Sequence, residues 1–553
     1  MTSSHEVPTE SCDICVIGTG AGGGILAYRL AMAGMDVLSI EQGNEIRDAY
    51  FTNDLSGEDQ PYFGIFPEMS WPLAAKESYL HGNPQTFRLY AKADTLATSE
   101  SSANAFVNRQ IYALNGKLNT WNGVSLRMAP RDFRAAEVGD GSCNWPIGYH
   151  DLESYYSSVE QLVGVCGTRE GIENLPDGDF IPPLPLRPID RLVAKSVQRI
   201  RGANVRAIPA RKAIETRHDR KQHCRSCGEC VFGCRFGSVF KFSSRLLPHI
   251  EGKSNYRIRY HTKVAKLTLR PDSNLVDTAE CIDSETGRRW SLRARVFVSA
   301  AGAIESPRLL LNSTDSRAPN GLANHSGLVG CYLQDKVRAM VASPLFRLLG
   351  SKPHYEFNCN DHLLIPRFLF EDGLRGGFQA QVCHVLPRRP YYIEGLQPFP
   401  GWSRKWIARG IFGSLAALLL LGKPEASRAN RLVPSGERDA FGVPKVHAEY
   451  SFSENDLRLR DAMIKYGRLI LWKCSGWMPT VFDDDLPGAT IHYAGTCRMA
   501  ATADEGVVGR ELRCFDHPNL YLCDGSVFPE VSEKNLTLTI MALAERLASH
   551  LQA

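Results

Sequence analysis

The 553-residue sequence lacks the marks of several broad classes of protein. Its 64 lysine and arginine residues nearly balance its 60 aspartate and glutamate residues, which leaves a net charge of +4. This balance, without a long basic run, argues against an electrostatic nucleic-acid binder. The first residues, MTSSHEVPTESCD, contain no basic segment followed by an apolar one, so no secretory signal is expected. Internal repeats and low-complexity tracts are also missing.

No apolar run in the sequence is long enough to cross a bilayer. The longest lies within GIFGSLAALLLLGKP, residues 410–424, and spans about a dozen residues against the ~20 that a membrane-spanning helix needs. A buried helix is therefore expected here, with an interfacial or substrate-contacting helix as the alternative. In the absence of an export signal, the 16 cysteines predict reduced thiols and a cytoplasmic protein.

The N-terminus carries a nucleotide-binding pattern. The run ICVIG, residues 14–18, predicts a strand, ILAYRLAMAG predicts a helix, and MDVLSIEQG predicts a second strand. Gly18, Gly20 and Gly23 occupy the G-x-G-x-x-G positions, where they allow a tight turn, close approach to a pyrophosphate and helix–strand packing. Glu41 ends the second strand, where an acid binds ribose hydroxyls.

The glycine pattern alone does not separate FAD from NAD. Its place at the start of a long chain favours FAD. So does a second apparent cofactor segment near the C-terminus, where LYLCDGSVFP predicts a strand and TLTIMALAERLASHL predicts an amphipathic helix.

These motifs resemble the glucose–methanol–choline (GMC) flavoprotein oxidoreductases, in particular their sugar-oxidising branch. The resemblance extends over most of the chain. Besides the N-terminal pattern, NGKLNTWNGVSLRM resembles the loop beneath the flavin, and VFVSAAGAIESPRLLLNS resembles the second family signature, with Thr314 where glycine is usual. HYAGTCRM and GVVGRELRCFDHPNLYLCDGSVFP resemble the C-terminal signature.

The resemblance implies an α/β fold. A Rossmann-like FAD-binding domain, of the GMC and p-hydroxybenzoate hydroxylase-like type, would interleave with an α+β substrate-binding domain. The expected FAD-binding parts are residues 1–150 with the flavin loop, 205–324 with a cysteine-rich loop, and 489–553 with the catalytic residues. The expected substrate-domain parts are an insertion at 151–204 and the main body at 325–488.

The resemblance also implies how FAD is held. The backbone of Val264 would contact the adenine, and Asp524 and Gly525 would lie near the pyrophosphate and ribityl chain. Thr120 stands where some relatives carry a histidine bonded covalently to FAD, so non-covalent FAD is expected. The expected cofactor-binding residues are Gly18, Gly20, Gly23, Glu41, Gln42, Gly116, Asn119, Thr120, Trp121, Val264, Ala301, Asp524 and Gly525.

His492, in ATIHYAGTCRM, and Asn535 match the catalytic positions of the family. Oxidation of an alcohol removes a hydride, which flavin N5 accepts, and a proton. Neutral imidazole, with an ordinary pKa of about 6.5, can accept that proton at neutral pH. The amide of Asn535 can hold the substrate oxygen. His492 is therefore interpreted as the general base.

The segment CRSCGECVFGC places Cys224, Cys227, Cys230 and Cys234 in C-x2-C-x2-C-x3-C spacing. This spacing is typical of thiolates around an iron–sulfur cluster, although Arg235 follows where ferredoxins have proline. A zinc site and a metal-free structural loop are the alternatives. With a cluster, electrons would leave the flavin through it to a redox partner, whereas without one dioxygen is a plausible acceptor.

The substrate is indicated only indirectly. Asp483, Asp484 and Asp485 could form an acidic rim that steers a cationic amino sugar, such as an aminoglycoside intermediate, or simply a solvated turn. The apolar run 415–421 would suit a lipid or sterol alcohol if it were exposed. The predicted function is FAD-dependent oxidation of a CH–OH group in a sugar-like molecule. A lipid-alcohol oxidase, an NAD(P)-dependent dehydrogenase and a non-catalytic carrier are the alternatives.

Overall fold

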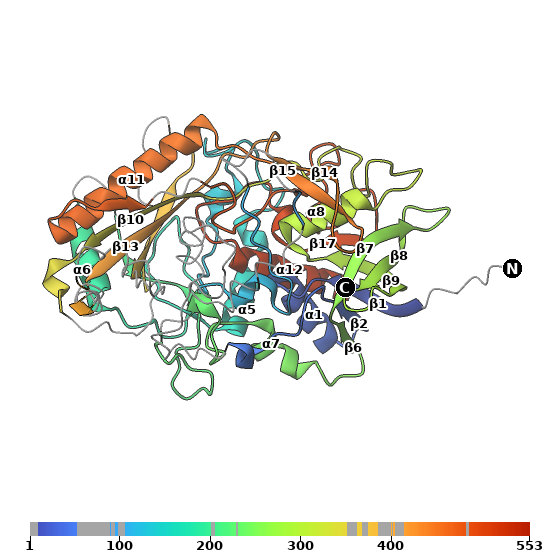
Figure 1. The fold of residues 1–553 in the computed structure, drawn as a ribbon, viewed down its shortest axis with the longest axis horizontal. Coiled ribbons are helices and arrows are strands. Elements are labelled where there is room, and N and C mark those ends of the chain that lie inside the picture. The colour runs from blue at the N-terminus through green and yellow to red at the C-terminus, as the bar shows by residue number, and fades with distance from the viewer. Residues whose placement is uncertain are drawn as a thin grey trace.

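The computed structural model describes most of the chain. The described residues are 9–51, 89, 95–97, 106–200, 205–227, 230–350, 362–367, 374–384, 400, 402–403, 414–482 and 486–553. They form two main sheets that lie side by side along the long axis of the molecule, with helices against both (Figure 1). The fold class expected from the sequence is confirmed as a mixed α/β structure with a partly parallel sheet.

The first sheet has seven strands in the order β6-β2-β1-β9-β8-β7, and β17 pairs with β9 beside this path. Its central part is parallel, since β1 pairs with β2 and β9, β2 pairs with β6, and β17 pairs with β9. The pairs β7–β8 and β8–β9 are antiparallel. The bounds are β1 Thr9–Ile17, β2 Val37–Ile40, β6 Tyr256–Arg259, β7 Thr262–Leu269, β8 Val276–Asp283, β9 Arg289–Ser299 and β17 Leu520–Leu522.

The two ends of the chain meet on β9. Ser299, the last residue of this strand, pairs with Ile17 of β1 and with Leu522 of β17. The turns that follow these three parallel strands therefore leave the sheet at one level. Ligands of open α/β sheets bind at such carboxyl ends.

Helices cover the first sheet. Helix α1 (Ala21–Met32) packs against α12 (Thr537–Gln552), which in turn packs against α5 (Glu153–Val163) (Figure 1). Helix α8 (Gly302–Asn312) follows β9 and packs against β7. The strand–helix–strand unit predicted at the N-terminus is confirmed as β1, α1 and β2, and the predicted C-terminal strand and helix are confirmed as β17 and α12.

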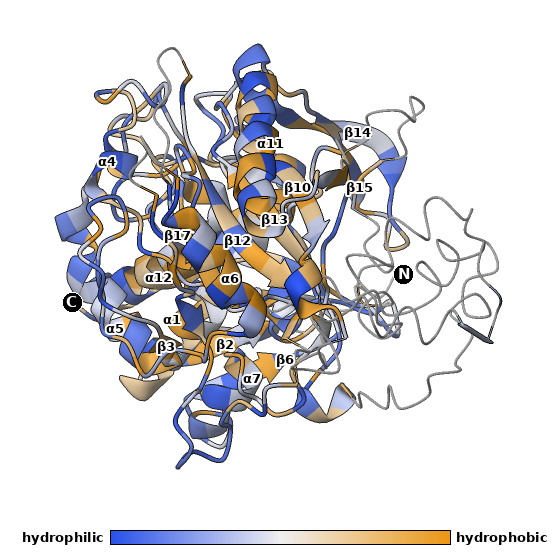
Figure 2. Ribbon diagram, turned by 90° about the vertical axis from the view of Figure 1, so that its left-hand side faces the viewer, coloured by the Kyte–Doolittle hydropathy of each residue, from blue (hydrophilic) through white to orange (hydrophobic). Residues whose placement is uncertain are grey.

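The second sheet has six strands in the order β16-β10-β13-β12-β11-β4, and every neighbouring pair is antiparallel. Helices α6 (Pro188–Val197) and α11 (Glu454–Ser475) pack against it, and α11 turns its hydrophilic residues outward (Figure 2). The bounds are β4 Ile208–Pro209, β10 Val337–Pro344, β11 Leu363–Ile365, β12 Phe378–His384, β13 Leu415–Gly422 and β16 Thr480–Phe482.

The expected helix in the longest apolar run is wrong. Residues Leu415–Gly422 form β13, a central strand between β10 and β12. A strand that is covered on both faces needs apolar residues at every position, so it loses the alternation that distinguishes strands from helices. The expected burial of this run is confirmed, because Leu418, Leu420 and Leu421 are nearly inaccessible to solvent.

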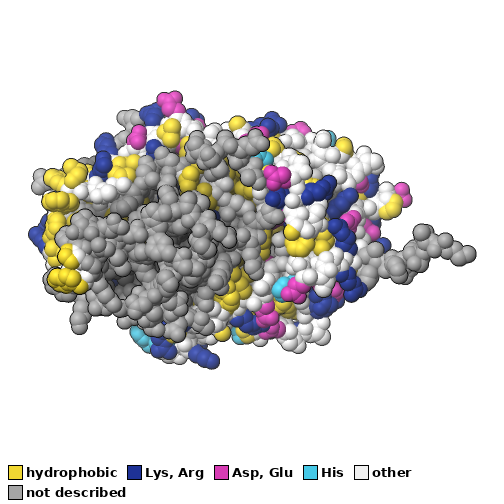
Figure 3. Space-filling model, viewed as in Figure 1, with side chains coloured by type: hydrophobic (Ala, Val, Ile, Leu, Met, Phe, Trp, Pro, Cys, Tyr) yellow, Lys and Arg dark blue, Asp and Glu magenta, His cyan; other side chains and the backbone are white. Residues whose placement is uncertain are grey.

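Shorter elements lie outside the two main sheets. They are the strands β3 (Val165–Cys166) and β5 (Lys212–Ala213), the hairpin of β14 (Arg431–Arg438) and β15 (Pro444–Glu449), and the helices α4 (Pro130–Phe133) and α7 (Phe242–Arg245). Basic and acidic side chains are interspersed over the visible surface of the first sheet and its helices (Figure 3). Within the described ranges, no helix combines the length and the apolar character needed to span a bilayer.

Candidate functional site

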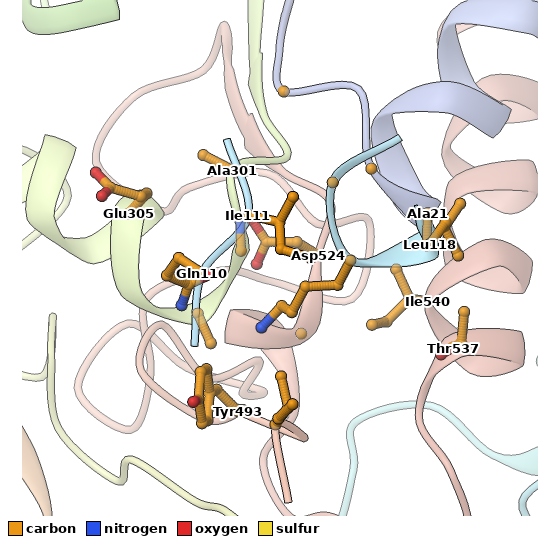
Figure 4. Close-up of a pocket in the computed structure, with 18 of the residues that line it drawn as sticks. Ala21, Gln110, Ile111, Leu118, Ala301, Glu305, Tyr493, Asp524, Thr537 and Ile540 are labelled. Carbon is orange, nitrogen blue, oxygen red and sulfur yellow. The ribbon is translucent and has the colours of Figure 1, made fainter. Parts of the chain in front are cut away.

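A cavity of about 450 Å³ lies between the two sheets. Ala301, Asp524, Leu118 and Tyr493 converge on it from four segments that are distant in the sequence (Figure 4). Every expected cofactor-binding residue lines this cavity except Gly23 and Asn119. His492 and Asn535 line it as well.

The three glycines of the N-terminal turn differ in their surroundings. Gly18 has φ +100°, which favours glycine, and a Cβ there would lie 2.6 Å from the carbonyl oxygen of Ala300. A Cβ on Gly23 would lie 2.0 Å from the carbonyl oxygen of Gly18, so Gly23 allows α1 to pack on the turn. A Cβ on Gly20 would meet no atom within 4 Å. Gly20 therefore presents bare backbone to open space.

The N-terminus of α1 opens into the same space. Ala21 and Gly22 line the cavity, no side chain caps the helix, and its first turn contains no acid. Free N–H groups and the positive end of the helix dipole are suited to a phosphate. The turn and the helix start therefore fit the pyrophosphate of a dinucleotide.

Glu41 follows β2 and is buried. Its carboxylate accepts hydrogen bonds from the Thr19 hydroxyl at 2.5 Å and the Gly43 backbone N–H at 3.0 Å. Burial raises the pKa of Glu41, against these hydrogen bonds, which lower it. The carboxylate is thus fixed beside the glycine turn, where a ribose hydroxyl could replace the Thr19 contact.

Asp524 joins the C-terminal segment to α8. Its carboxylate accepts hydrogen bonds from the backbone N–H of Gly302 at 2.8 Å and from the Ser306 hydroxyl at 2.6 Å. It also accepts one from the backbone N–H of Ser526 at 2.8 Å. The side chain therefore ties together two of the turns that leave the sheet at the level of the cavity.

The loop of residues 115–121 forms the next wall. It contains a short 3-10 helix, Gly116–Asn119, which begins after Asn115 in the left-handed region at φ +78°. The Asn119 amide donates hydrogen bonds to the carbonyls of Leu114 and Gly116 at 2.8 and 3.0 Å, which explains why this residue shapes the loop without lining the cavity. Thr120 lines the cavity.

His492 and Asn535 meet at the wall of the cavity. The side-chain nitrogen Nδ2 of Asn535 lies 3.0 Å from Nε2 of His492, although 43 residues separate them in the sequence. Asp335 holds the backbone around the histidine, since its carboxylate accepts from the N–H groups of Thr490 at 3.0 Å and His492 at 2.8 Å. Between these two residues, Ile491 has φ +63°, a rare conformation for a β-branched residue.

Positive charges surround the imidazole. Burial, together with the ammonium groups of Lys336 and Lys117, lowers the pKa of His492 to about 3. Burial also lowers the pKa of Lys336 to about 7 and that of Lys117 to about 8. The Lys117 ammonium lies 4.2 Å from the centre of the Tyr493 ring. The imidazole is therefore neutral, and able to accept a proton, throughout the neutral pH range.

The described residues of the cysteine-rich loop do not form a metal-ligand cluster. Cys230 and Cys234 are buried and pack with apolar side chains, whereas Cys224 and Cys227 are partly exposed. Among the described residues, no group of three or more potential ligands is arranged to hold a metal ion. Burial raises the thiol pKa of Cys224 and holds that of Cys230 well above its ordinary value. The expectation of a possible iron–sulfur or zinc site is thus not supported.

The substrate side of the cavity is formed by the second sheet. The residues it contributes are Arg338, Met340, Gln381, Cys383, Leu419 and Leu421. Most of these side chains are apolar. The expected acidic rim, Asp483, Asp484 and Asp485, lies outside the described residues.

Several residues of this site were not identified from the sequence. Lys117 lies in the flavin loop, but a single lysine there carries no motif that predicts a role. Asp335 sits in LQDKV with no motif to mark it. Gln379 and Gln381 carry one usable signal in the sequence, because two polar residues alternate with Phe378, Ala380 and Val382 in β12. Buried polar side chains in such a strand need hydrogen-bond partners.

The chain is similar to known proteins in sequence and in fold. Two family models, both described as GMC oxidoreductase, match residues 142–338 and 426–544. Paromamine 6'-oxidase from Streptomyces fradiae is 26% identical over 97% of this chain and 90% of its own. 6'''-Hydroxyparomomycin C oxidase from Streptomyces lividus is 29% identical over 98% of this chain and 92% of its own. The structure of pyridoxine 4-oxidase from Mesorbium loti shares the fold, with a TM-score of 0.61 and 19% identity over 98% of this chain and 99% of its own.

Proposed function

Since the chain belongs to the GMC oxidoreductase family of flavoproteins, we propose that it oxidises a CH–OH group of a sugar-like small molecule to a carbonyl while holding FAD non-covalently. The observation that carries this proposal is the approach of His492 Nε2 and Asn535 Nδ2 to 3.0 Å at the wall of the cavity that the glycine turn also lines. This arrangement brings a proton acceptor and an amide donor to the place where the two ends of the chain meet.

The cavity supports the binding of FAD. The uncapped start of α1, the open space at Gly20 and the backbone near Asp524 fit its pyrophosphate, and Glu41 and Val264 fit its adenosine half. Bound FAD supplies the acceptor for the hydride that leaves the carbinol carbon. Thr120 offers no imidazole for a covalent bond to the flavin.

The chain's own residues handle the hydroxyl group. Asn535 can donate an N–H to the substrate oxygen, and neutral His492 can accept the hydroxyl proton at Nε2. The proton and the hydride together account for both hydrogens that an alcohol loses on becoming a carbonyl. Lys336 and Lys117 place positive charge near the oxygen, where negative charge develops as the proton leaves.

A sugar-like substrate is supported by the two relatives whose names specify oxidation of aminoglycoside compounds. One observation favours a second candidate, an apolar alcohol. Met340, Leu419 and Leu421 present apolar surface to the cavity from the second sheet. Apolar groups on a substrate would be buried against this surface, whereas ring hydroxyls there would lose hydrogen bonds with water.

Anaerobic reduction of the flavin tests both candidates. The protein, loaded with FAD, is mixed with an amino sugar that carries a hydroxymethyl group, a neutral sugar, and an apolar primary alcohol of similar size. The absorbance of oxidised flavin is then followed in time. Fast loss of absorbance with a sugar supports the first candidate, and fast loss only with the apolar alcohol supports the second. No reduction by any alcohol would favour the non-catalytic carrier. Oxygen consumption after reduction identifies dioxygen as the acceptor.

A further inference from the structure

Two glutamines of the second sheet form hydrogen bonds with the side-chain amide of Asn535. Gln379 and Gln381 lie two residues apart on β12, so they project from the same face of the strand. Their Nε2 atoms lie 3.1 and 2.9 Å from Oδ1 of Asn535. Both glutamines are almost fully buried, at 1% and 3% exposure, so these contacts are not in competition with water.

A main-chain carbonyl fixes the direction of every hydrogen bond in this group. Nε2 of Gln379 also lies 3.0 Å from the carbonyl oxygen of Glu533. A carbonyl oxygen only accepts, so the amide nitrogen of Gln379 must face it. The atom of Asn535 that meets the same nitrogen must then be its oxygen, and the amide nitrogen of Asn535 must point the other way.

The amide nitrogen of Asn535 therefore points at His492. It lies 3.0 Å from Nε2 and can only donate, so Nε2 accepts and carries no proton. In a neutral imidazole the proton must then sit on Nδ1. Nδ1 is buried and makes no well-formed hydrogen bond within the described part of the chain. A backbone hydrogen bond with Thr490 nevertheless raises the pKa of the imidazole, as an acceptor of its proton does, and Nε2 is already occupied by Asn535.

We propose that Gln379 and Gln381 are positioning residues, which act through Asn535 to hold His492 as the Nδ1–H tautomer with the lone pair of Nε2 facing the substrate. The inference rests on the catalytic roles proposed above for His492 and Asn535. A substrate hydroxyl that enters between the two side chains meets an acceptor at Nε2 and a donor at Nδ2, which matches its one donor hydrogen and its acceptor lone pairs. On oxidation, the hydroxyl proton would move to Nε2 of His492, and bound FAD would supply the acceptor for the hydride that leaves the carbon.

The two glutamine amides are buried among apolar neighbours. In the register of the sheet, Gln379 lies opposite Leu421 and Gln381 lies opposite Leu419. Burial of a polar amide among such neighbours costs free energy unless its hydrogen bonds are made. Both amides make them to Asn535, whose Nδ2 lies 3.0 Å from Nε2 of the proposed base.

Nitrogen-15 NMR of the FAD-loaded protein labelled at histidine tests the tautomer directly. The His492→Asn variant identifies the resonances of His492 by their loss, and no substrate is added. We expect a protonated Nδ1 and an unprotonated Nε2 at pH 8. A proton on Nε2 in the wild type would overturn the proposal. This measurement stands apart from activity, so a failure of every alcohol to reduce the flavin would instead refute the proposed function.

Gln381→Glu tests the coupling. The introduced carboxylate only accepts, so it should turn the Asn535 amide and drive the proton of His492 to Nε2. The rate of flavin reduction by alcohol should fall at least ~10-fold at pH 8 and recover at lower pH, where the carboxyl is protonated and donates again. Gln381→Leu is the matched control, because it removes one donor without adding a titrating group and should show no recovery at low pH. If Gln381→Glu changes neither the tautomer nor the shape of the pH profile, the proposal is wrong. If this variant does not fold, the wild-type NMR result decides alone.

Discussion

At the scale of single residues, the reacting pair depends on support from outside its own motif. Ile491 adopts φ +63° beside His492, a conformation that costs free energy in a β-branched residue. Asp335 offsets that cost by accepting the N–H groups on both sides of it, and the Thr490 hydroxyl donates to the same carboxylate. A strained backbone that a distant carboxylate holds in place is typical of a site where side-chain direction matters.

Replacement of His492 should slow the oxidation of alcohol without loss of bound FAD. His492→Ala should retain FAD but reduce the rate of flavin reduction by alcohol at least ~100-fold, because the hydroxyl proton loses its acceptor. Stopped-flow absorbance under anaerobic conditions measures this rate. His150→Ala is the control, since the His150 side chain is 90% exposed and does not line the cavity. Equal rates in wild type and His492→Ala would remove this residue from the mechanism.

The charge on Lys336 should control the acid limb of the pH profile. Its ammonium disfavours a second positive charge on His492, and together with burial it holds the pKa of His492 at about 3. In Lys336→Met this repulsion is gone, so the pKa of His492 should rise and flavin reduction should decline at a higher pH than in the wild type. Above pH 7 the two profiles should converge, because Lys336, with a pKa of about 7, is itself losing its proton there.

Rates of flavin reduction between pH 4.5 and 8.5 test this expectation. Lys473→Met on the exposed surface of α11 is the control for loss of a lysine, and it should keep the wild-type profile. A Lys336→Met profile that stays as flat as the wild-type profile down to pH 4.5, or a loss of rate confined to alkaline pH, would contradict the assigned electrostatics.

At the scale of elements, the sequence predicts helices and strands that have a local pattern, but it does not predict which distant segments pair with them. The strand–turn–helix at the N-terminus was predictable because its glycines, apolar periodicity and acid all lie within about 30 residues. The strand at 415–421 could not be predicted from its own residues, since only its neighbours β10 and β12 define it as a central strand. The roles of Gln379 and Asp335 could not be predicted for the same reason, because their partners lie more than 150 residues away in the sequence.

The turn before α1 allows a test in which folding and cofactor binding separate. In Gly20→Val the new side chain points into open space, so the fold should survive, but the space that a pyrophosphate needs is filled. FAD should be lost from the purified protein while the far-ultraviolet circular dichroism is unchanged. Gly436→Val on β14 is the matched control, since a Cβ there also meets nothing within 4 Å. Stoichiometric FAD in Gly20→Val would refute the placement of the pyrophosphate.

At the scale of the whole molecule, the cavity couples segments that the sequence keeps far apart. The two ends of the chain pair with the same strand, β9, and the second sheet closes the cavity from the other side. The proposed division into FAD-binding parts at 1–150, 205–324 and 489–553 stays a prediction, as do the substrate-domain parts at 151–204 and 325–488. The shared cavity nevertheless implies that a ligand bound there touches both sheets.

FAD should therefore stabilise both sheets rather than the first alone. A ligand that binds only the folded state adds about 2.7 kcal/mol to the free energy of unfolding when its free concentration is 100 times its Kd. If both walls of the cavity contact FAD, addition of FAD to the deflavinated protein should slow hydrogen exchange in peptides from β1 and β9 and also in peptides from β12 and β13. Mass spectrometry of the peptides measures the rate of hydrogen exchange in each sheet separately. In Gly20→Val, addition of FAD should slow hydrogen exchange in neither sheet. Protection confined to β1 and β9 would mean that the second sheet does not close over the cofactor, although Gln381 and Leu419 of that sheet line the cavity.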